Sequence, residues 1–542
     1  MTRTSNLTRR GLIKGAAASG LVLPATGLFA PALAQRSTDR VILGATQEPA
    51  QFNPLLYSNG GTETIPEALM FDALWDVTEK GDFVPNLAAR LPTRENGDVS
   101  PDGRVWRVHL KRDVTWSDGQ PFTARDVEFT YRTIVDPAVA ARMRSGFDLI
   151  ESFEVIDDHT VEMRLSTNYV PFYWAWQAMH IVPRHLLEGE TDINTSGFNA
   201  QPVGTGPYTL QSRMAGSHMI YAANESYHRG RPAIGQFIHA FIPDQLVAYG
   251  QARTGEIDMF TLSGVPADRW DEAKALPGRV FMETPMPWVQ FIYFNCEKPQ
   301  FSDPRVRKAL YVALEMQKSI DDITFGTNLR TMSYLSPLHW AYNGDLPEET
   351  ADPARAERML DDAGWTRGPD GIRAKDGVQL KFTMSTTAGV PSRQATQAMF
   401  QQNWKDIGVE MEIRNMPGSV VWGDYTTKSE FDTLLVAWEP TMGMDPDYSA
   451  RCHTDAIGSG ANYTLYSNPE VDRLLDLGAS QEDMEERRDT YGQVQAILLD
   501  EVPFAPQMAL NQGGLRKEAL QGIKPNQYVT DAAWNVHEWS WG

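Results

Sequence analysis

Apolar and polar residues alternate in short runs along most of the chain, which predicts many short strands separated by turns and helices. The run VWRVHL, residues 105–110, alternates as a strand with one buried face does, and DVTW, residues 113–116, is expected to pair with it as a hairpin. The segment SDGQP then has the glycine and proline of a turn. Thr123 is expected to cap a helix, because its hydroxyl can accept from backbone N–H groups near Asp126.

The same periodicities predict elements on either side of this segment. Residues 40–45, RVILGA, are a first buried strand, and residues 153–165, FEVIDDHTVEMRL, are a strand pair. Residues 242–260 predict a helix that is ended by Gly255 and followed by a short strand. The residues expected on the buried side of this helix are Leu246, Tyr249 and Ala252.

The second half of the chain alternates strands and helices. VQFIYF, residues 289–294, and FDTLLVAW, residues 431–438, are apolar enough for strands of a buried sheet. Helical patterns lie between and after them, up to Pro503, and the tail beyond has strand-like turns. This order predicts an α/β protein, and a chain of this length is expected to form two or three domains rather than one core.

The N-terminus resembles a twin-arginine export signal. TRRGLIK at 8–14 precedes a weakly apolar stretch, and Ala-Leu-Ala at 32–34 is a cleavage site. A transmembrane anchor is the alternative, but prolines and a glycine interrupt the apolar run. No cysteine follows the cut at Gln35 to carry a lipid. The mature protein is therefore expected to be free in the periplasm of a two-membrane bacterium.

Charge restricts the partners. The formal net charge is -21, and removing the four basic residues of the signal makes it -25, so nucleic acid is an unfavourable partner. The acidity keeps a secreted protein soluble, and a mild preference for cationic ligands is the alternative interpretation.

The sequence offers little support for metal or catalytic chemistry. The only two cysteines, Cys296 and Cys452, are compatible with a disulfide or with buried free thiols. No CxxC, HExxH, GxSxG, Walker or kinase pattern occurs, so neither a metal nor another cofactor is expected, and the protein is predicted not to be an enzyme. Asp445 and Asp447 are interpreted as turn caps rather than as a glycosidase pair.

The run WSDGQPFTARDVEFTY, residues 116–131, resembles the signature of family 5 of the extracellular solute-binding proteins, the peptide/nickel class of ABC-transporter receptors. The order of the other segments matches that family along nearly all of the mature chain. The resemblance implies an α/β, two-lobed periplasmic-binding-protein fold with mixed sheets, two hinge strands and an α+β subdomain inserted in the first lobe. The expected divisions are a signal peptide at 1–34, lobe one at 35–288 with the insertion at about 85–195, lobe two at 289–504, and a return to lobe one at 505–542.

The resemblance also implies a function. The chain is expected to be the periplasmic substrate-binding component of an ABC importer, capturing a peptide or peptide-like solute in the interlobe cleft and delivering it, as a monomer, to a membrane permease and its ATPase. The same role for an opine, an oligosaccharide or a metal chelate is the alternative, and a periplasmic hydrolase or chaperone ranks behind both.

Peptide-binding relatives commonly pair the ligand's α-amine with an aspartate three residues after a tryptophan at the end of the strand that matches FDTLLVAW. Here Trp438 is followed by Thr441 at that place, so the acid is missing unless Glu439 or Asp445 replaces it. This change predicts weak binding of unmodified dipeptides. The other residues expected to contact the ligand are Trp422, Trp288, Glu48 and Asn53.

Overall fold

The computed structural model describes residues 39–56, 63–261, 264–438, 443–529 and 533–542. The chain divides into a short first unit, Met1–Asp39, and a second unit, Arg40–Gly542, to which the fold below belongs. The predicted signal peptide lies outside the described residues. Within them, no helix combines the length and the apolar character that crossing a bilayer requires.

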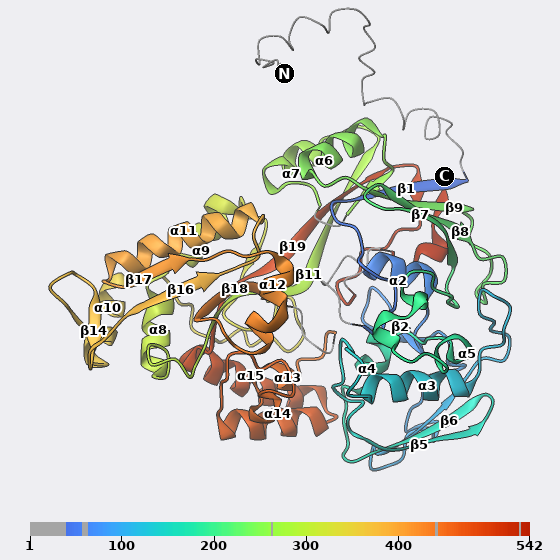
Figure 1. Cartoon of the computed structure of the whole chain (residues 1–542), viewed down its shortest axis with the longest axis horizontal. Helices are drawn as coiled ribbons and strands as arrows, with labels where there is room; N and C mark the ends of the chain where they lie inside the picture. Colours follow the sequence, from blue (N-terminus) through green and yellow to red (C-terminus); the bar gives the residue numbers. More distant parts are fainter. Residues whose placement is uncertain (1–38, 57–62, 262–263, 439–442, 530–532) are drawn as a thin grey trace, which may run out of the picture. The chain divides into compact units, whose positions relative to one another are not determined.

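A mixed sheet of eleven strands runs through the second unit (Figure 1). Ten strands follow in one path, and the eleventh pairs off that path with β19. In spatial order they are β17 (Glu410–Ile413), β16 (Lys381–Ser385), β18 (Thr433–Trp438), β11 (Arg279–Phe294), β19 (Phe504–Lys517), β10 (Met259–Phe260), β1 (Arg40–Ala45), β9 (Gln236–Phe241), β8 (His218–Ala223) and β7 (Tyr208–Met214), with β12 (Leu329–Arg330) beside β19.

Two long strands connect the two lobes. We name the part around β1 and β7 to β10 lobe one, and the part around β16 to β18 lobe two. β11 and β19 pair antiparallel from lobe one into lobe two, and both are long ribbons through the centre of Figure 1. Their register shifts between Pro285 and Val289, leaving the intervening three residues of β11 without a register partner on β19. Prolines at 285 and 287 explain the break, since proline has no N–H to give to a ladder.

A separate α+β part lies in lobe one. Its three-stranded sheet has the order β4 (Val105–His109), β6 (Thr160–Leu165), β5 (Ile150–Asp157). The predicted hairpin between residues 105–110 and 113–116 is wrong, because β4 pairs with β6 instead. That pairing places Trp106 opposite Met163 and Val108 opposite Val161, which buries all four side chains. In residues 113–116, only Thr115 makes a bridge, to Pro121.

The turn and helix that follow agree with the prediction. Gly119 has a φ of 89°, which glycine adopts without strain. Helix α3 (Ala124–Val135) starts after Thr123, and the Asp126 carboxylate accepts from the Thr123 backbone N–H at 2.8 Å. The other elements of this region are α2 (Thr64–Met70), β2 (Trp75–Val77), β3 (Phe83–Pro85), α4 (Phe172–Ala178) and α5 (Arg184–Leu187).

The rest of lobe one contains α6 (Gln245–Thr254) and α7 (Trp270–Lys274), together with the C-terminal strands β20 (Leu520–Gln521) and β21 (Ser540–Trp541). Gly255 ends α6 with a φ of 86°, as predicted. The predicted buried side of α6 is correct for Tyr249 and Ala252 but wrong for Leu246, which is 60% exposed. Leu246 lies in the first turn, which the Asp244 side chain caps, and Ala248 takes its place in the core.

In lobe two, helices pack around the strands and form two hydrophobic clusters. One cluster includes Leu310, Leu360 and Trp404, and the other includes Leu474 and Val494. The helices are α8 (Pro304–Val312), α9 (Met316–Ile323), α10 (Pro353–Asp362), α11 (Pro391–Asp406), α12 (Gly418–Val420), α13 (Ser449–Cys452), α14 (Pro469–Ser480) and α15 (Met484–Glu501), and a small sheet is formed by β13 (Thr366–Arg367), β14 (Arg373–Lys375) and β15 (Val378–Gln379).

Candidate functional site

The two lobes also meet away from the crossing strands. The Tyr169 hydroxyl, in lobe one, donates to the Asp447 carboxylate of lobe two at 2.9 Å, and both residues are buried. The Val170 N–H donates to the Ala479 carbonyl at 2.8 Å. Gly443 lies so close to the Trp174 ring that a Cβ atom there would be 2.4 Å from it. These contacts and the crossing strands bound the region in which a ligand can touch both lobes.

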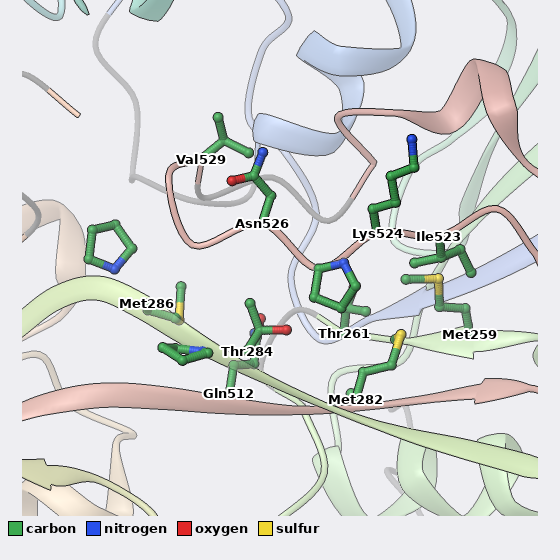
Figure 2. Close-up of a pocket in the computed structure, with 14 residues that line it drawn as sticks. Met259, Thr261, Met282, Thr284, Met286, Gln512, Ile523, Lys524, Asn526 and Val529 are labelled. Carbon is green, nitrogen blue, oxygen red and sulfur yellow. The ribbon is translucent and has the colours of Figure 1, made fainter. Parts of the chain in front are cut away.

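A cavity lies at the break between the crossing strands. It has about 500 Å³ of space, open solvent included. Met282 and Thr284 of β11 and Gln512 of β19 line one side, and the tail segment 523–529 lines the other (Figure 2). Thioethers, prolines and aliphatic groups give it an apolar character. Lys524 is its one cation, and its ammonium group pairs with Glu538 at 2.6 Å.

A smaller space of about 190 Å³, open solvent included, is also lined by Pro285, Met286 and Pro287. It extends to Leu338 and Met444 of lobe two. The hollows therefore follow the crossing from lobe one into lobe two, where a ligand in contact with both lobes would lie.

Aromatic rings gather at the carboxyl end of β18. Trp438 is half-buried, and its ring centroid lies 5.1 Å from that of Trp422, at an angle of 68°. Tyr463 is the next ring, at 6.2 Å, and the Arg451 guanidinium lies over Trp438 at 4.2 Å from the centroid. The Trp438 indole N–H is buried and has no acceptor among the residues that the structure describes. This end of the sheet therefore combines flat apolar surface with an unused donor.

Asp445 is committed to another residue of the protein. Its side chain and that of Arg487 are each 3% exposed, and one guanidinium nitrogen reaches the two carboxylate oxygens at 2.7 and 2.9 Å. Burial alone would lower the pKa of Arg487, but the adjacent Asp445 carboxylate has a larger, opposite effect, so the pKa of Arg487 is raised. An acid matched in this way is a poor partner for a ligand amine, and we leave Asp445 out of the proposed site.

Two predicted contacts in lobe one are likewise engaged within the protein. Glu48 accepts from Arg213 at 2.8 Å and from the Gly216 N–H at 2.7 Å. Asn53 is fully buried, donates to the Asn199 side chain at 3.0 Å and accepts from the Leu55 N–H at 3.1 Å. Both side chains hold loops of lobe one together, which argues against the predicted ligand contacts.

Three predicted ligand contacts remain: Trp288, Glu439 and Thr441. Trp288 is half-buried and lies beside the hollows, at the register shift between β11 and β19. Glu439 and Thr441 lie outside the described residues, so their role stays a prediction.

Comparison with known proteins identifies the family. Residues 82–459 match the family described as bacterial extracellular solute-binding proteins, family 5 Middle. The chain belongs to family 5. Protein XP55 of Streptomyces lividans is 31% identical to it over 507 residues, which are 92% of this chain and 90% of XP55.

Solved structures of similar proteins agree with the family 5 fold. The oligopeptide-binding protein AppA of Bacillus subtilis is 27% identical over 509 residues, 92% of this chain and 91% of AppA. Its structure with a nonapeptide has a TM-score of 0.83 at 26% identity, over 93% of this chain and 99% of that one. The structure of NikZ from Campylobacter jejuni in complex with Ni(L-His) has a TM-score of 0.80 at 25% identity, and the match covers 93% of this chain and 100% of NikZ. These matches confirm the predicted family and the two-lobed α/β fold.

Sequence reasoning missed one charged residue of this family 5 chain. Arg393 is half-buried in the first turn of α11, after the carboxyl end of β16. Its one hydrogen bond within the described chain goes from Nε to the Gln290 side-chain oxygen, at 3.3 Å. Burial lowers the pKa of Arg393 to about 10. Its place just beyond a buried parallel strand is the signal that marks it as a candidate.

Both cysteines are free thiols in the structure. Cys452 is buried and Cys296 half-buried, and burial raises the pKa of Cys296 to about 11. Of the two interpretations left open by the sequence, the structure therefore shows unpaired thiols.

Proposed function

We propose that this chain is the periplasmic substrate-binding component of an ABC importer, which captures a peptide or peptide-like solute between its lobes and delivers it to a membrane permease. Family membership supports the receptor role, and the oligopeptide-binding name of AppA supports the solute class. The observation that carries the proposal is the pair of crossing strands, broken at Pro285–Val289, beside the hollows that reach both lobes.

This arrangement suits capture by closure. Residues 286–288 of β11 have no register partner on β19, so bending there breaks few hydrogen bonds between the two crossing strands. The Tyr169–Asp447 bond and the Val170–Ala479 bond link the lobes and would open in such a motion. A ligand that touches both lobes shifts the equilibrium toward the form that makes these contacts, by its difference in affinity for the two forms. We propose that the permease recognises this form.

Trp438, Trp422 and Trp288 are the proposed aromatic contacts of the ligand. Their rings offer a large contact area near the crossing, as ligand sites in open α/β sheets do. Thr441 stands where peptide-binding relatives have an acid, and Asp445 is held by Arg487. Glu439 is then the nearest acid in sequence, and we propose that ligands without a free α-amine bind more tightly than unmodified dipeptides.

A metal chelate is the second candidate solute, because a similar structure holds Ni(L-His). A chelate brings its own metal ligands, so it needs only a cleft of suitable shape and polarity. An opine or an oligosaccharide would fit the same description. In each case the chain acts as a receptor rather than as an enzyme.

Location and partners complete the proposal. We propose that the segment 1–34 is a twin-arginine signal that is removed, leaving a monomer free in the periplasm without a lipid anchor. Its partners are then a permease and ATPase complex at the inner membrane. Fractionation of cells that carry Arg9→Lys and Arg10→Lys together tests the route, since both arginines are required for it. Continued export of that variant would contradict it.

The experiment that tests the receptor role is calorimetry of the mature protein against free and N-acetylated peptides, opines, oligosaccharides and metal chelates. Small-angle scattering follows with the tightest ligand, and a smaller radius of gyration at saturation is expected. An unchanged scattering profile at saturation would contradict closure. Tight binding of free peptides that is lost on acetylation and in Glu439→Gln would show that the amine anchor has moved rather than disappeared.

A further inference from the structure

We propose that Arg393 recognises an anionic group of the ligand, so that this receptor selects solutes that carry a carboxylate at the edge of the lobe-two sheet. The inference rests on the proposed function and names the charge of the solute that it binds.

The topology places Arg393 at the edge of the sheet that meets lobe one. β16 and β18 are parallel neighbours, so their carboxyl ends lie at the same edge. The chain beyond β18 contacts lobe one through Gly443 and Asp447. The chain beyond β16 leads to Arg393, and its partner Gln290 lies on β11. Gln290 adjoins Val289, the residue that pairs with Trp438, so the Gln290 side chain and the Trp438 ring lie on opposite faces of the sheet.

The described residues do not match the charge of Arg393 with an acid. No Asp or Glu of the described chain forms an ion pair with it, and a single bond of 3.3 Å to a neutral amide is its only hydrogen bond there. A guanidinium has five N–H groups, so four are left for another acceptor.

Two buried arginines of lobe two, Arg487 and Arg307, are satisfied within the protein. Arg487 binds Asp445, and Arg307 donates to the backbone carbonyls of Phe301, Glu501 and Val502. A buried charge without a partner is costly, and such groups are concentrated at functional sites.

A chain of hydrogen bonds anchors the Arg393 contact in both crossing strands. The Gln290 amide turns its oxygen toward Arg393 and donates through Nε2 to Gln507 on β19 at 2.7 Å. Gln507 donates in turn to the Ser319 hydroxyl at 2.7 Å, and Ser319 donates to the Met316 carbonyl at 2.6 Å. Gln290 and Gln507 are 3% and 0% exposed. The chain therefore fixes Gln290 with its acceptor facing the guanidinium, which makes Gln290 a positioning residue.

The same edge offers further donors without acceptors. The Trp438 indole N–H and the Thr387 hydroxyl are buried and have no partner among the described residues. Thr387 follows β16 and lies near Trp422, since both approach the Cβ position of Gly418 within 3.6 Å. Arg393 and Trp438 therefore carry N–H groups that no described residue accepts, and the Thr387 hydroxyl has no partner there. A carboxylate supplies acceptors and a negative charge together.

The test compares N-acetylated peptides that end in a free carboxylate with the same peptides ending in an amide, together with acid and amide forms of an opine. Acetylation removes the amine, so the two forms differ only in the anionic group. Wild-type protein is expected to bind the acid about 30-fold more tightly or better, as charge-assisted bonds to arginine allow. In Arg393→Gln the acid should lose about that factor, and the amide should keep its Kd.

Two further variants exclude indirect effects. Arg358→Gln removes an exposed arginine of α10, changes the net charge equally and is expected to keep the acid preference. Gln290→Met keeps the arginine but removes its orienting acceptor, so the acid-to-amide ratio should fall while the Kd for the amide stays constant. A purely structural role for Gln290 would weaken both forms equally.

The outcomes separate this inference from the proposed function. Equal binding of acid and amide, unchanged in Arg393→Gln, would overturn the anion site and leave the receptor role intact. Failure of every solute class to bind would overturn both. A preference for the acid that survives in Arg393→Gln would assign the anionic group to another residue.

Discussion

Arg487 and Arg393 are arginines of lobe two, one buried and one half-buried, and they have opposite surroundings. Arg487 binds both oxygens of Asp445, donates to the Gly478 carbonyl and lies over the rings of Trp340 and Tyr491. Arg393 has one 3.3 Å bond to the Gln290 amide. The pKa of Arg487 is raised by its carboxylate despite burial, whereas burial lowers the pKa of Arg393 to about 10. The first arginine stabilises the fold, and the second keeps its capacity for a ligand.

The comparison shows why an inventory of charged residues does not locate a binding site. Asp445 was a predicted ligand contact because it follows Trp438 in sequence, but the protein has already neutralised it. Arg393 has no residue of opposite charge paired with it in the described chain, so its positive charge is available to a ligand.

The largest effect is expected for Asp445→Asn. It leaves Arg487 buried without its counter-charge, which should lower the free energy of unfolding by about 3–5 kcal/mol. Urea denaturation of the mature protein measures it. The matched control is Asp476→Asn, whose carboxylate is 76% exposed beside His453 and should contribute below about 1 kcal/mol. Equal losses in the two variants would remove the contrast between a matched buried pair and a surface pair.

His239 provides a third case, a buried titratable group that avoids the cost of charge by staying neutral. It is 0% exposed, and neither ring nitrogen has a partner among the described residues. Burial lowers its pKa to about 3. The folded protein therefore binds fewer protons than the unfolded chain as the pH falls from about 6.5 toward 3, and stability present above pH 6.5 is lost over that window.

Between pH 7 and pH 4 the free energy of unfolding falls in both proteins. We expect the fall to be about 1–3 kcal/mol smaller in His239→Leu than in wild type, because leucine has no proton to gain. Denaturation at a series of pH values measures the difference, which cancels the same-sign effects of other buried histidines such as His339. Phe241→Leu is the control, because its ring lies 4.9 Å from His239 and cannot titrate. If its pH profile changed as much as that of His239→Leu, packing rather than protonation would be the cause.

Local pattern predicted much of the fold. Alternation located β5 and β6, a nearly continuous apolar run located β18, and a glycine located the end of α6. The predicted partner of β4 was wrong because strands pair so as to bury their apolar faces together. The partners of β4, Val161 and Met163 of β6, lie more than fifty residues after it in the chain. A nearby turn signal favoured the wrong neighbour.

The candidate site was harder to predict for a similar reason. Trp422 and Trp438 were both expected at the cleft, and the structure places their rings 5.1 Å apart. Glu48 and Asn53 were also expected there, but their partners Arg213 and Asn199 are remote in sequence. Whether a polar side chain is free for a ligand depends on contacts between distant segments, which periodicity and spacing do not contain.

Asp447, two residues after Asp445, accepts from Ser449 within lobe two and from Tyr169 across the lobes. Tyr169→Phe removes the hydroxyl that donates to it and should weaken the form in which the lobes touch. We expect ligand Kd to rise about 5-fold to 10-fold, mainly through faster dissociation, because one hydrogen bond to a carboxylate is lost. Tyr131→Phe is the control, since its hydroxyl bonds within lobe one to the Ile150 carbonyl. Equal effects would mean that the interlobe bond does not contribute to closure.

The smallest effect is expected for Arg393→Met without ligand. The substitution removes a single 3.3 Å bond and also the cost of a half-buried charge, so the free energy of unfolding should change by less than about 1 kcal/mol. Arg487→Met is the comparison, because it strands Asp445 in the core and should cost about 3–5 kcal/mol. Urea denaturation of both variants in ligand-free buffer measures the difference. A loss in Arg393→Met as large as that in Arg487→Met would mean that the protein itself satisfies Arg393, and the distinction between the two arginines would fail. A near-zero change, combined with loss of acid binding, is the combination that only a ligand-directed arginine produces, because a structural arginine cannot be removed without unfolding cost.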